Sequence, residues 1–181
     1  MKRKLVVHVG PNYLLPGTRH GIRVKEDEVH LCYEPDKSNW HFLKRKNPKA
    51  RVGISGKAFE KSSLAKESVD EIHIHNVLCD PEVFFKKQIL QKAAVALKPG
   101  GRIWVGHTRT PDNFSFDQFK ATARKFGLNA KIVVMDETGK GEPSRKQLRL
   151  MTNRMGNIVE EGVMNNFFLA VLTKPKAKNN S

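Results

Sequence analysis

The sequence is short of cysteine, of long apolar runs and of acidic residues. Among 181 residues, only Cys32 and Cys79 are cysteines, too few for a disulfide framework or a zinc cluster, which suits a reducing cytoplasm. No apolar run approaches the roughly 20 residues that span a bilayer, so no membrane association is expected. The apolar stretch 5–9 is too short and interrupted for a secretory leader. We therefore expect a cytoplasmic protein in which this stretch is a strand.

The deficit of acid leaves a strongly basic chain. There are 33 Lys and Arg against 18 Asp and Glu, which gives a formal net charge of +15. Such a chain attracts polyanions, so RNA or DNA is an expected partner, although charge alone supplies only non-specific affinity. The oligomeric state cannot be inferred from these features. The basic residues expected to contact nucleic acid are Lys37, Lys44, Arg45, Lys46, Lys49, Arg51, Arg145, Lys146 and Arg149.

The segment 37–57 combines seven Lys or Arg with aromatic residues and contains no acid. This composition is typical of a surface that contacts phosphates and stacks a base, with Trp40 as the stacking ring. It is also compatible with an amphipathic helix that packs Trp40 and Leu43 into the core and exposes its lysines. Both interpretations stay open at this point.

Apolar runs alternate with helical patterns, which predicts an α/β fold with a mostly parallel sheet. We expect a single domain over residues 1–173, with a basic insertion at 136–162 and a flexible basic tail at 174–181. Residues 10–25 contain too many Pro and Gly for a normal helix, so the first crossover should be shortened. The predicted strands are 4–9, 28–33, 50–55, 71–75, 102–105, 131–135 and 166–173, and the predicted helices are 82–97 and 116–126.

Residues 97–105, Leu-Lys-Pro-Gly-Gly-Arg-Ile-Trp-Val, are the most informative stretch. Pro99 cannot continue the preceding helix, and Gly100 and Gly101 can take the positive φ of a tight exit into a buried strand. Residues 68–78 precede them as a strand that ends in a loop containing Asn76. Together these segments resemble the fourth and fifth strands of class I S-adenosylmethionine-dependent methyltransferases.

The N-terminal stretch 8–17 extends the resemblance. Its Gly10, Asn12, Pro16 and Gly17 are similar to a subgroup that opens with Leu-Gly-Cys-Gly-x-Asn and continues into a Leu-Pro-Gly turn. The resemblance implies a three-layer Rossmann-like sandwich with a seven-stranded, mostly parallel sheet. It also implies methyl transfer from S-adenosylmethionine to an acceptor that the sequence does not identify, with nucleic acid as one candidate.

Open α/β sheets bind ligands at the carboxyl ends of their strands. A glycine after the first strand lets the backbone approach the ligand, an acid after the second can accept bonds from both ribose hydroxyls, and a polar group after the third can hold the adenine edge. On the acceptor side, the resemblance implies Asn76 and His107 as catalytic candidates, with His107 as a general base. The residues that it implies for the cofactor are His8, Gly10, Asn12, Glu34, Gly56, Lys57 and Asn76.

Several departures from the family pattern define an alternative. His8 stands at the family's first glycine, so the first glycine-rich motif is degenerate, and Lys57 replaces the acid that often binds adenine. If residues 21–24 formed the second strand, Arg23 would stand near the place of the ribose-binding acid; we prefer 28–33, and hence Glu34, because it is the better strand. The alternative is a catalytically inactive module that serves as a basic nucleic-acid-binding or structural protein.

His73 and His75 lie two residues apart and so face the same side of a strand. Such a pair can be half of a metal site, but no cluster of carboxylates or cysteines accompanies it in the sequence. We therefore predict packed or hydrogen-bonded strand histidines and no metal.

Overall fold

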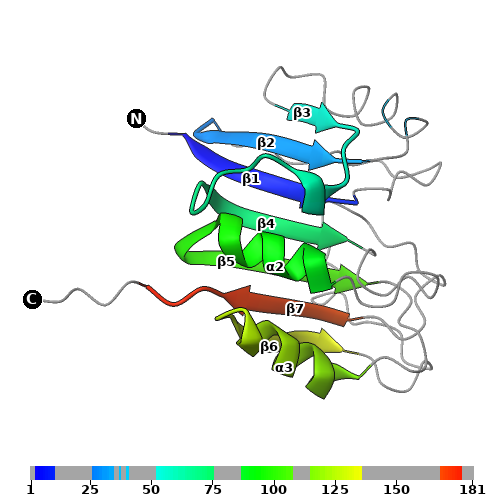
Figure 1. The fold of residues 1–181 in the computed structure, drawn as a ribbon, viewed down its shortest axis with the longest axis vertical. Helices are drawn as coiled ribbons and strands as arrows, with labels where there is room; N and C mark the ends of the chain where they lie inside the picture. Colours follow the sequence, from blue (N-terminus) through cyan, green and yellow to red (C-terminus); the bar gives the residue numbers. More distant parts are fainter. Residues whose placement is uncertain are drawn as a thin grey trace, which may run out of the picture.

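The computed structural model describes residues 3–10, 26–34, 37, 40, 52–75, 87–107, 115–135 and 168–176. Within these ranges, seven strands form one sheet in the order β3-β2-β1-β4-β5-β7-β6 (Figure 1). The strands are β1 (Lys4–Val9), β2 (Glu28–Tyr33), β3 (Val52–Ser55), β4 (Val69–His75), β5 (Leu97–His107), β6 (Asn129–Met135) and β7 (Phe168–Thr173). The described helices are η1 (Phe59–Lys61), α2 (Lys87–Ala96) and α3 (Phe116–Lys125).

The sheet is parallel except for one strand. β1 pairs in parallel with β2 and β4, β2 with β3, and β4 with β5, whereas β7 runs antiparallel to both β5 and β6. Figure 1 shows the arrowheads of β1 to β6 at one edge and that of β7 at the opposite edge. The predicted Rossmann-like fold with a mostly parallel sheet is therefore confirmed. The predicted shortened crossover lies outside the described residues except for Gly10.

The hydrophobic core lies between the sheet and the layer made by η1, α2 and α3, which Figure 1 shows on one face of the strands. Successive side chains of a strand point to opposite faces, so alternate residues of β1, β4 and β5 reach this layer. Each fully buried aliphatic or aromatic side chain contributes roughly 1.5–3 kcal/mol. The largest fully buried side chains are Phe59, Phe119, Ile72, Ile74, Ile89, Leu90, Leu97 and Ile103.

The Pro-Gly-Gly turn forms as a bulge near the start of β5. Leu97 pairs with Val69 of β4, and pairing then resumes between Arg102 and Glu71, so residues 98–101 stand opposite a single residue of β4. The predicted turn is thus present, but β5 is longer than the strand predicted at 102–105 because a paired residue precedes the turn.

Two glycines make this turn possible. Gly100 has a φ of +77°, which L-residues with a Cβ rarely adopt. A Cβ on Gly101 would lie 2.8 Å from side-chain carbons of Leu97. Gly100 therefore has the positive φ that the sequence predicted, whereas Gly101 does not and requires glycine because a side chain would clash with Leu97.

Lys174 closes the same turn from the C-terminal side. Its Nζ donates to the carbonyl oxygens of Ala94 (3.1 Å) and Leu97 (2.9 Å) at the end of α2 and pairs with Glu67 at 3.2 Å. A cation at this end of a helix is favourable because the last carbonyls lack partners within the helix. Lys174 is therefore held against this turn, and residues 177–181 of the predicted tail lie outside the described ranges.

The other predicted elements differ mainly at their ends. α3 begins at Phe116, where the Ser115 side chain accepts a bond from the backbone of Gln118, and Gly127 follows it with a φ of +74°, as predicted for a C-cap. β4 and β6 begin two residues earlier than predicted. The described parts of β3 and β7 begin at Val52 and Phe168, and the first two residues predicted for each strand lie outside the described ranges. None of the described helices has the length and apolar character needed to traverse a bilayer.

Candidate functional site

The carboxyl ends of β1, β2 and β3 are joined by backbone hydrogen bonds. The N–H of Gly10 donates to the carbonyl of Tyr33 (3.0 Å), and the N–H of Glu34 donates to the carbonyl of Ser55 (3.0 Å). Gly10 has a φ of +61°, so the chain turns away from β1 at a residue without a side chain. Three of the predicted cofactor residues, Gly10, Glu34 and Gly56, consequently lie at one edge of the sheet.

Glu34 is buried, with 3% of its surface exposed, although it follows directly after a strand. Its backbone N–H is bonded to Ser55 of β3, and its carbonyl accepts a 2.8 Å hydrogen bond from the indole Nε1 of Trp40. Burial, and to a smaller degree the charge of Glu34, raise the pKa of the nearby Cys32 thiol to about 12. Cys32 is therefore a protonated core residue with no nucleophilic character at neutral pH.

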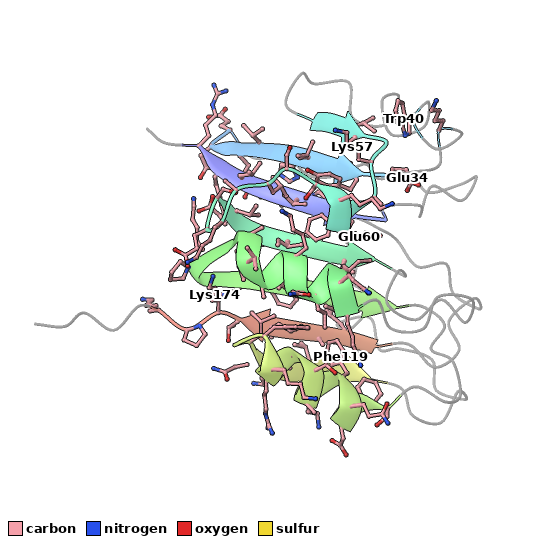
Figure 2. All side chains as sticks on the ribbon, viewed as in Figure 1. Glu34, Trp40, Lys57, Glu60, Phe119 and Lys174 are labelled. Carbon is pink, nitrogen blue, oxygen red and sulfur yellow. The ribbon has the colours of Figure 1, made fainter. Side chains whose placement is uncertain are left out.

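Trp40 covers the ends of β2 and β3. Its backbone N–H donates to the carbonyl of Lys37 (3.1 Å), and its half-buried indole lies against Gly56. A Cβ on Gly56 would stand 2.6 Å from Cζ2 of this ring, so only glycine leaves room for it. Figure 2 shows Trp40 beside Glu34 at this edge. The sequence singled out Trp40 as a stacking or core residue but did not predict this position.

Lys57 follows Gly56 and its side chain is exposed. Its backbone N–H donates to the Ser55 hydroxyl at 3.3 Å. Lys37 is also exposed, so two of the cations in the basic segment stand at this end of the sheet.

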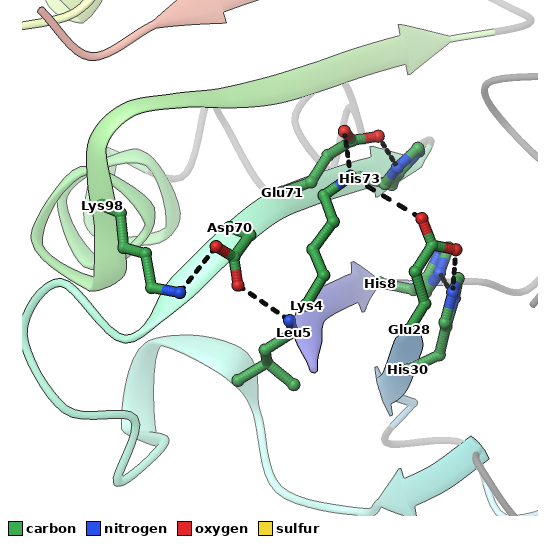
Figure 3. Close-up of polar contacts among 9 residues, drawn as sticks. All are labelled: Lys4, Leu5, His8, Glu28, His30, Asp70, Glu71, His73 and Lys98. Atoms are coloured by element: carbon green, nitrogen blue, oxygen red, sulfur yellow. Dashed lines mark hydrogen bonds and ion pairs between the residues drawn. The ribbon is translucent and has the colours of Figure 1, made fainter. Parts of the chain in front are cut away.

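His8 lies in the sheet and contacts histidines of the two neighbouring strands (Figure 3). Its ring stacks between those of His30 and His73, with centroid distances of 5.1 and 4.9 Å. Its Nε2 lies 2.9 Å from Nδ1 of His30, so one of these nitrogens donates and the other accepts. His8 is 3% exposed, and its predicted contact with a cofactor stays a prediction.

Carboxylates complete this histidine ladder, defined as His8, His30 and His73. Nε2 of His30 lies 3.1 Å from Glu28, and Nε2 of His73 lies 2.8 Å from Glu71. His73 is thus a hydrogen-bonded strand histidine, as predicted. In the part of the chain that the structure describes, no group of three His, Cys, Asp or Glu side chains is placed to hold a metal ion.

The ladder perturbs two pKa values. Burial, the largest effect, lowers the pKa of His30 below 6.5, and the charges of His73 and Lys4 act in the same direction against the raising effect of Glu28. Burial alone would raise the pKa of Glu71. The hydrogen bond and charge of His73, together with Lys4 at 3.2 Å, outweigh it and hold the pKa at about 2.

Solved structures share this arrangement of strands and helices. A TehB-like S-adenosylmethionine-dependent methyltransferase from Corynebacterium glutamicum superposes with a TM-score of 0.61 and 17% identity, covering 96% of this chain and 82% of that one. The Burkholderia thailandensis 1,6-didemethyltoxoflavin-N1-methyltransferase does so with a TM-score of 0.58 and 11% identity, covering 97% and 72%. The chain has the fold of class I S-adenosylmethionine-dependent methyltransferases.

At these identities the likeness extends to the fold alone. No protein-family model matches the sequence, and neither does any curated protein. The 4+2 cyclase SpnF has the same methyltransferase fold, with a TM-score of 0.62 and 12% identity, covering 97% of this chain and 76% of that one. Since one fold hosts different reactions, the function must be argued from the site.

Seen on the methyltransferase fold, one half of the candidate site fits an adenosyl cofactor. The carboxylate of Glu34 suits the nucleoside's sugar, and the turn at Gly10, which has no side chain, leaves room for the part of the ligand beyond it. The base end differs, because Lys57 brings a cation and Trp40 already lies against Gly56.

Of the remaining predicted residues, only His107 lies within the described ranges. His107 is the last residue of β5, which ends at the same edge as β1. Asn12 and Asn76 lie outside the described residues, as do Lys44, Arg45, Lys46, Lys49, Arg51, Arg145, Lys146 and Arg149.

Proposed function

We propose that this chain binds S-adenosylmethionine at the carboxyl ends of β1, β2 and β3 and transfers its methyl group to an acceptor. The observation that carries the proposal is Glu34, a carboxylate held at the end of β2 by a backbone bond to β3 and adjacent to the Gly10 turn. An ionised carboxylate has two acceptor oxygens, which suit the two neighbouring hydroxyls of a ribose.

S-adenosylmethionine supplies a methyl group that is already activated on a positively charged sulfur. The protein then has to hold donor and acceptor in line and exclude water, which needs few reacting side chains. In this proposal Glu34 holds the sugar and Gly10 leaves room for the rest of the ligand. Asn76 and His107, which follow β4 and end β5, position the acceptor, and His107 takes up the proton that the acceptor loses.

Replacing Glu34 tests the proposed site. Glu34→Gln keeps the shape but removes the charge, and a charge-assisted hydrogen bond is worth about 1.5–3 kcal/mol, so affinity for S-adenosylmethionine should fall by about tenfold or more. The matched control is Glu67→Gln, which removes a carboxylate that pairs with Lys174 at the other end of the sheet. Equilibrium dialysis with labelled ligand measures both variants. Equal affinities in Glu34→Gln and the wild type would exclude Glu34 as a ligand.

For the acceptor we propose nucleic acid, because the net charge is +15 and Lys37 and Lys57 are exposed beside the candidate site. The test is transfer of a labelled methyl group to single-stranded RNA, duplex RNA and DNA. Label in one of these pools, lost in Glu34→Gln, is the expected result. Label in none of them, with cofactor binding intact, would contradict a nucleic-acid acceptor.

A second candidate is a non-catalytic nucleic-acid-binding module, which the same charge and the seated indole of Trp40 favour. This module would bind RNA with an affinity that falls linearly with salt on logarithmic axes, with a slope of about −0.7 per phosphate contacted on a single strand. It would bind RNA without any affinity for S-adenosylmethionine. An affinity that does not respond to salt would contradict it.

A further inference from the structure

Trp40 is held at the sheet edge by three contacts, two of its indole and one of its backbone. Its Nε1 donates to the carbonyl of Glu34 at 2.8 Å, and its six-membered ring rests on Gly56. The backbone N–H of the same residue is bonded to Lys37 at 3.1 Å. The ring therefore bridges the end of β2 and the end of β3 (Figure 2).

This is the place that a nucleoside's base would need, given the proposed function. A ribose bound by Glu34 has β1 with Gly10 on one side and β3 with Gly56 on the other. If the remainder of the ligand runs along the Gly10 turn, the base must lie on the β3 side. Gly56 on that side is already in contact with a bicyclic aromatic ring that carries an N–H donor.

Access to Glu34 points the same way. Glu34 is only 3% exposed in the arrangement in which the indole of Trp40 donates to its backbone carbonyl. A ribose cannot reach this carboxylate from solvent in the arrangement described. Some group at this edge must move first, and the indole is a large side chain that is hydrogen-bonded to the backbone carbonyl of Glu34.

We propose that Trp40 is an internal competitor for the base of an adenosyl ligand: its indole occupies the base position and must swing away before the ligand binds. The proposal rests on the proposed function, because it assumes that the edge takes a nucleoside. In the free protein the indole thus blocks the base position, so the protein is autoinhibited. The apparent dissociation constant then equals the intrinsic one divided by the fraction of molecules whose indole has left.

Variants at two positions separate this role from that of a stacking wall. If the indole is seated in about nine of ten molecules, Trp40→Ala tightens binding of S-adenosylhomocysteine about tenfold, whereas loss of a stacking wall would weaken it. Gly56→Ala places a carbon 2.6 Å from Cζ2 and so expels the ring without removing it. In the Trp40→Ala background there is no indole to expel, so Gly56→Ala should not increase affinity further. A loss of affinity in this double variant would identify a direct clash between the added methyl group and the ligand. The matched control is Trp104→Phe, which changes a tryptophan of β5.

The position of the Trp40 indole can be followed by NMR, since the chain has only two tryptophans and Trp104→Phe assigns their indole N–H signals. Titration of the wild-type protein with S-adenosylhomocysteine should shift the Trp40 signal towards the position it has in Gly56→Ala. Circular dichroism confirms that each variant is folded; should Trp40→Ala fail to fold, Gly56→Ala carries the test.

Each outcome decides between the two proposals. Tighter binding in Trp40→Ala and a displaced indole signal support the competitor. Weaker or equal binding in that variant, or an indole signal that does not move while the ligand binds, overturns it and leaves the proposed function standing. No binding by the wild type, Trp40→Ala or Gly56→Ala at millimolar ligand overturns the proposed function and the competitor with it.

Discussion

Glu71 should make the stability of this protein depend on acid. Its pKa in the folded chain is about 2, against an ordinary value of 4.5. A carboxyl group whose pKa is lowered by folding stabilises the folded state when ionised, so its contribution is complete above pH 4.5 and is lost as the pH falls through about 2. The contacts responsible are His73 at 2.8 Å and Lys4 at 3.2 Å.

The size of the effect follows from the two pKa values. They differ by about 2.5 (4.5 − 2), and each pH unit corresponds to about 1.4 kcal/mol, so the ionised carboxylate contributes about 3 kcal/mol at neutral pH. Only 16% of the side chain is exposed, so solvent screening reduces this figure little. The contribution should be near its full value at pH 6 and about half of it at pH 3.

The assay is urea denaturation of the wild type and Glu71→Gln between pH 6 and pH 3, followed by tryptophan fluorescence. Glutamine keeps the shape and one acceptor oxygen, so the difference in unfolding free energy should approach about 3 kcal/mol at pH 6 and shrink as the pH falls. The control is Asp117→Asn, whose carboxylate is 92% exposed beside Lys120; exposed pairs contribute about 1 kcal/mol or less.

Two results would refute this reasoning. A difference between wild type and Glu71→Gln that stays constant from pH 6 to pH 3 would mean that shape, not charge, stabilises this position. A difference near zero throughout would mean that the pKa of Glu71 is ordinary. The lowered pKa of His30 also removes stability as the pH falls below 6.5, but it does so in both proteins and is largely removed by the comparison.

Two further predictions concern the turn at the other edge of the sheet. Asp70→Ala removes the acceptor of the Leu5 N–H (2.8 Å) and of Lys98 (2.6 Å) and should lower the unfolding free energy by about 2–3 kcal/mol. Asp70→Asn keeps one acceptor oxygen and should recover part of this loss; equal losses in the two variants would contradict the prediction. Gly101→Ala brings a carbon within 2.8 Å of Leu97 and should cost about 1–3 kcal/mol in the same assay, and an unchanged stability would show that the turn adapts without strain.

Local patterns were sufficient for most of the fold. The turn at Gly100 and the C-cap at Gly127 were predicted because a positive φ favours glycine whatever surrounds it. Strands at 4–9 and 28–33 were found with their observed bounds because both are apolar runs limited by turn residues. The preference for 28–33 as the second strand is supported by its pairing with β1, which places Glu34 at the edge.

The parts that the sequence did not predict depend on contacts between distant residues. The histidine ladder requires the register of β1 against both β2 and β4. That register sets His8 opposite His73 and opposite Cys32, which lies two residues after His30. No local pattern contains that information. The position of Trp40 likewise depends on how the end of β2 meets Gly56, whose missing side chain is informative only after the two are placed together.

The most direct test of the central claim is calorimetric titration of the purified protein with S-adenosylmethionine and S-adenosylhomocysteine, repeated with Trp40→Ala. We expect saturable binding to one site in the micromolar range, tighter in Trp40→Ala and weakened by Glu34→Gln. Absence of binding to both proteins at millimolar ligand would contradict it, and the methyltransferase fold would then serve another function in this chain.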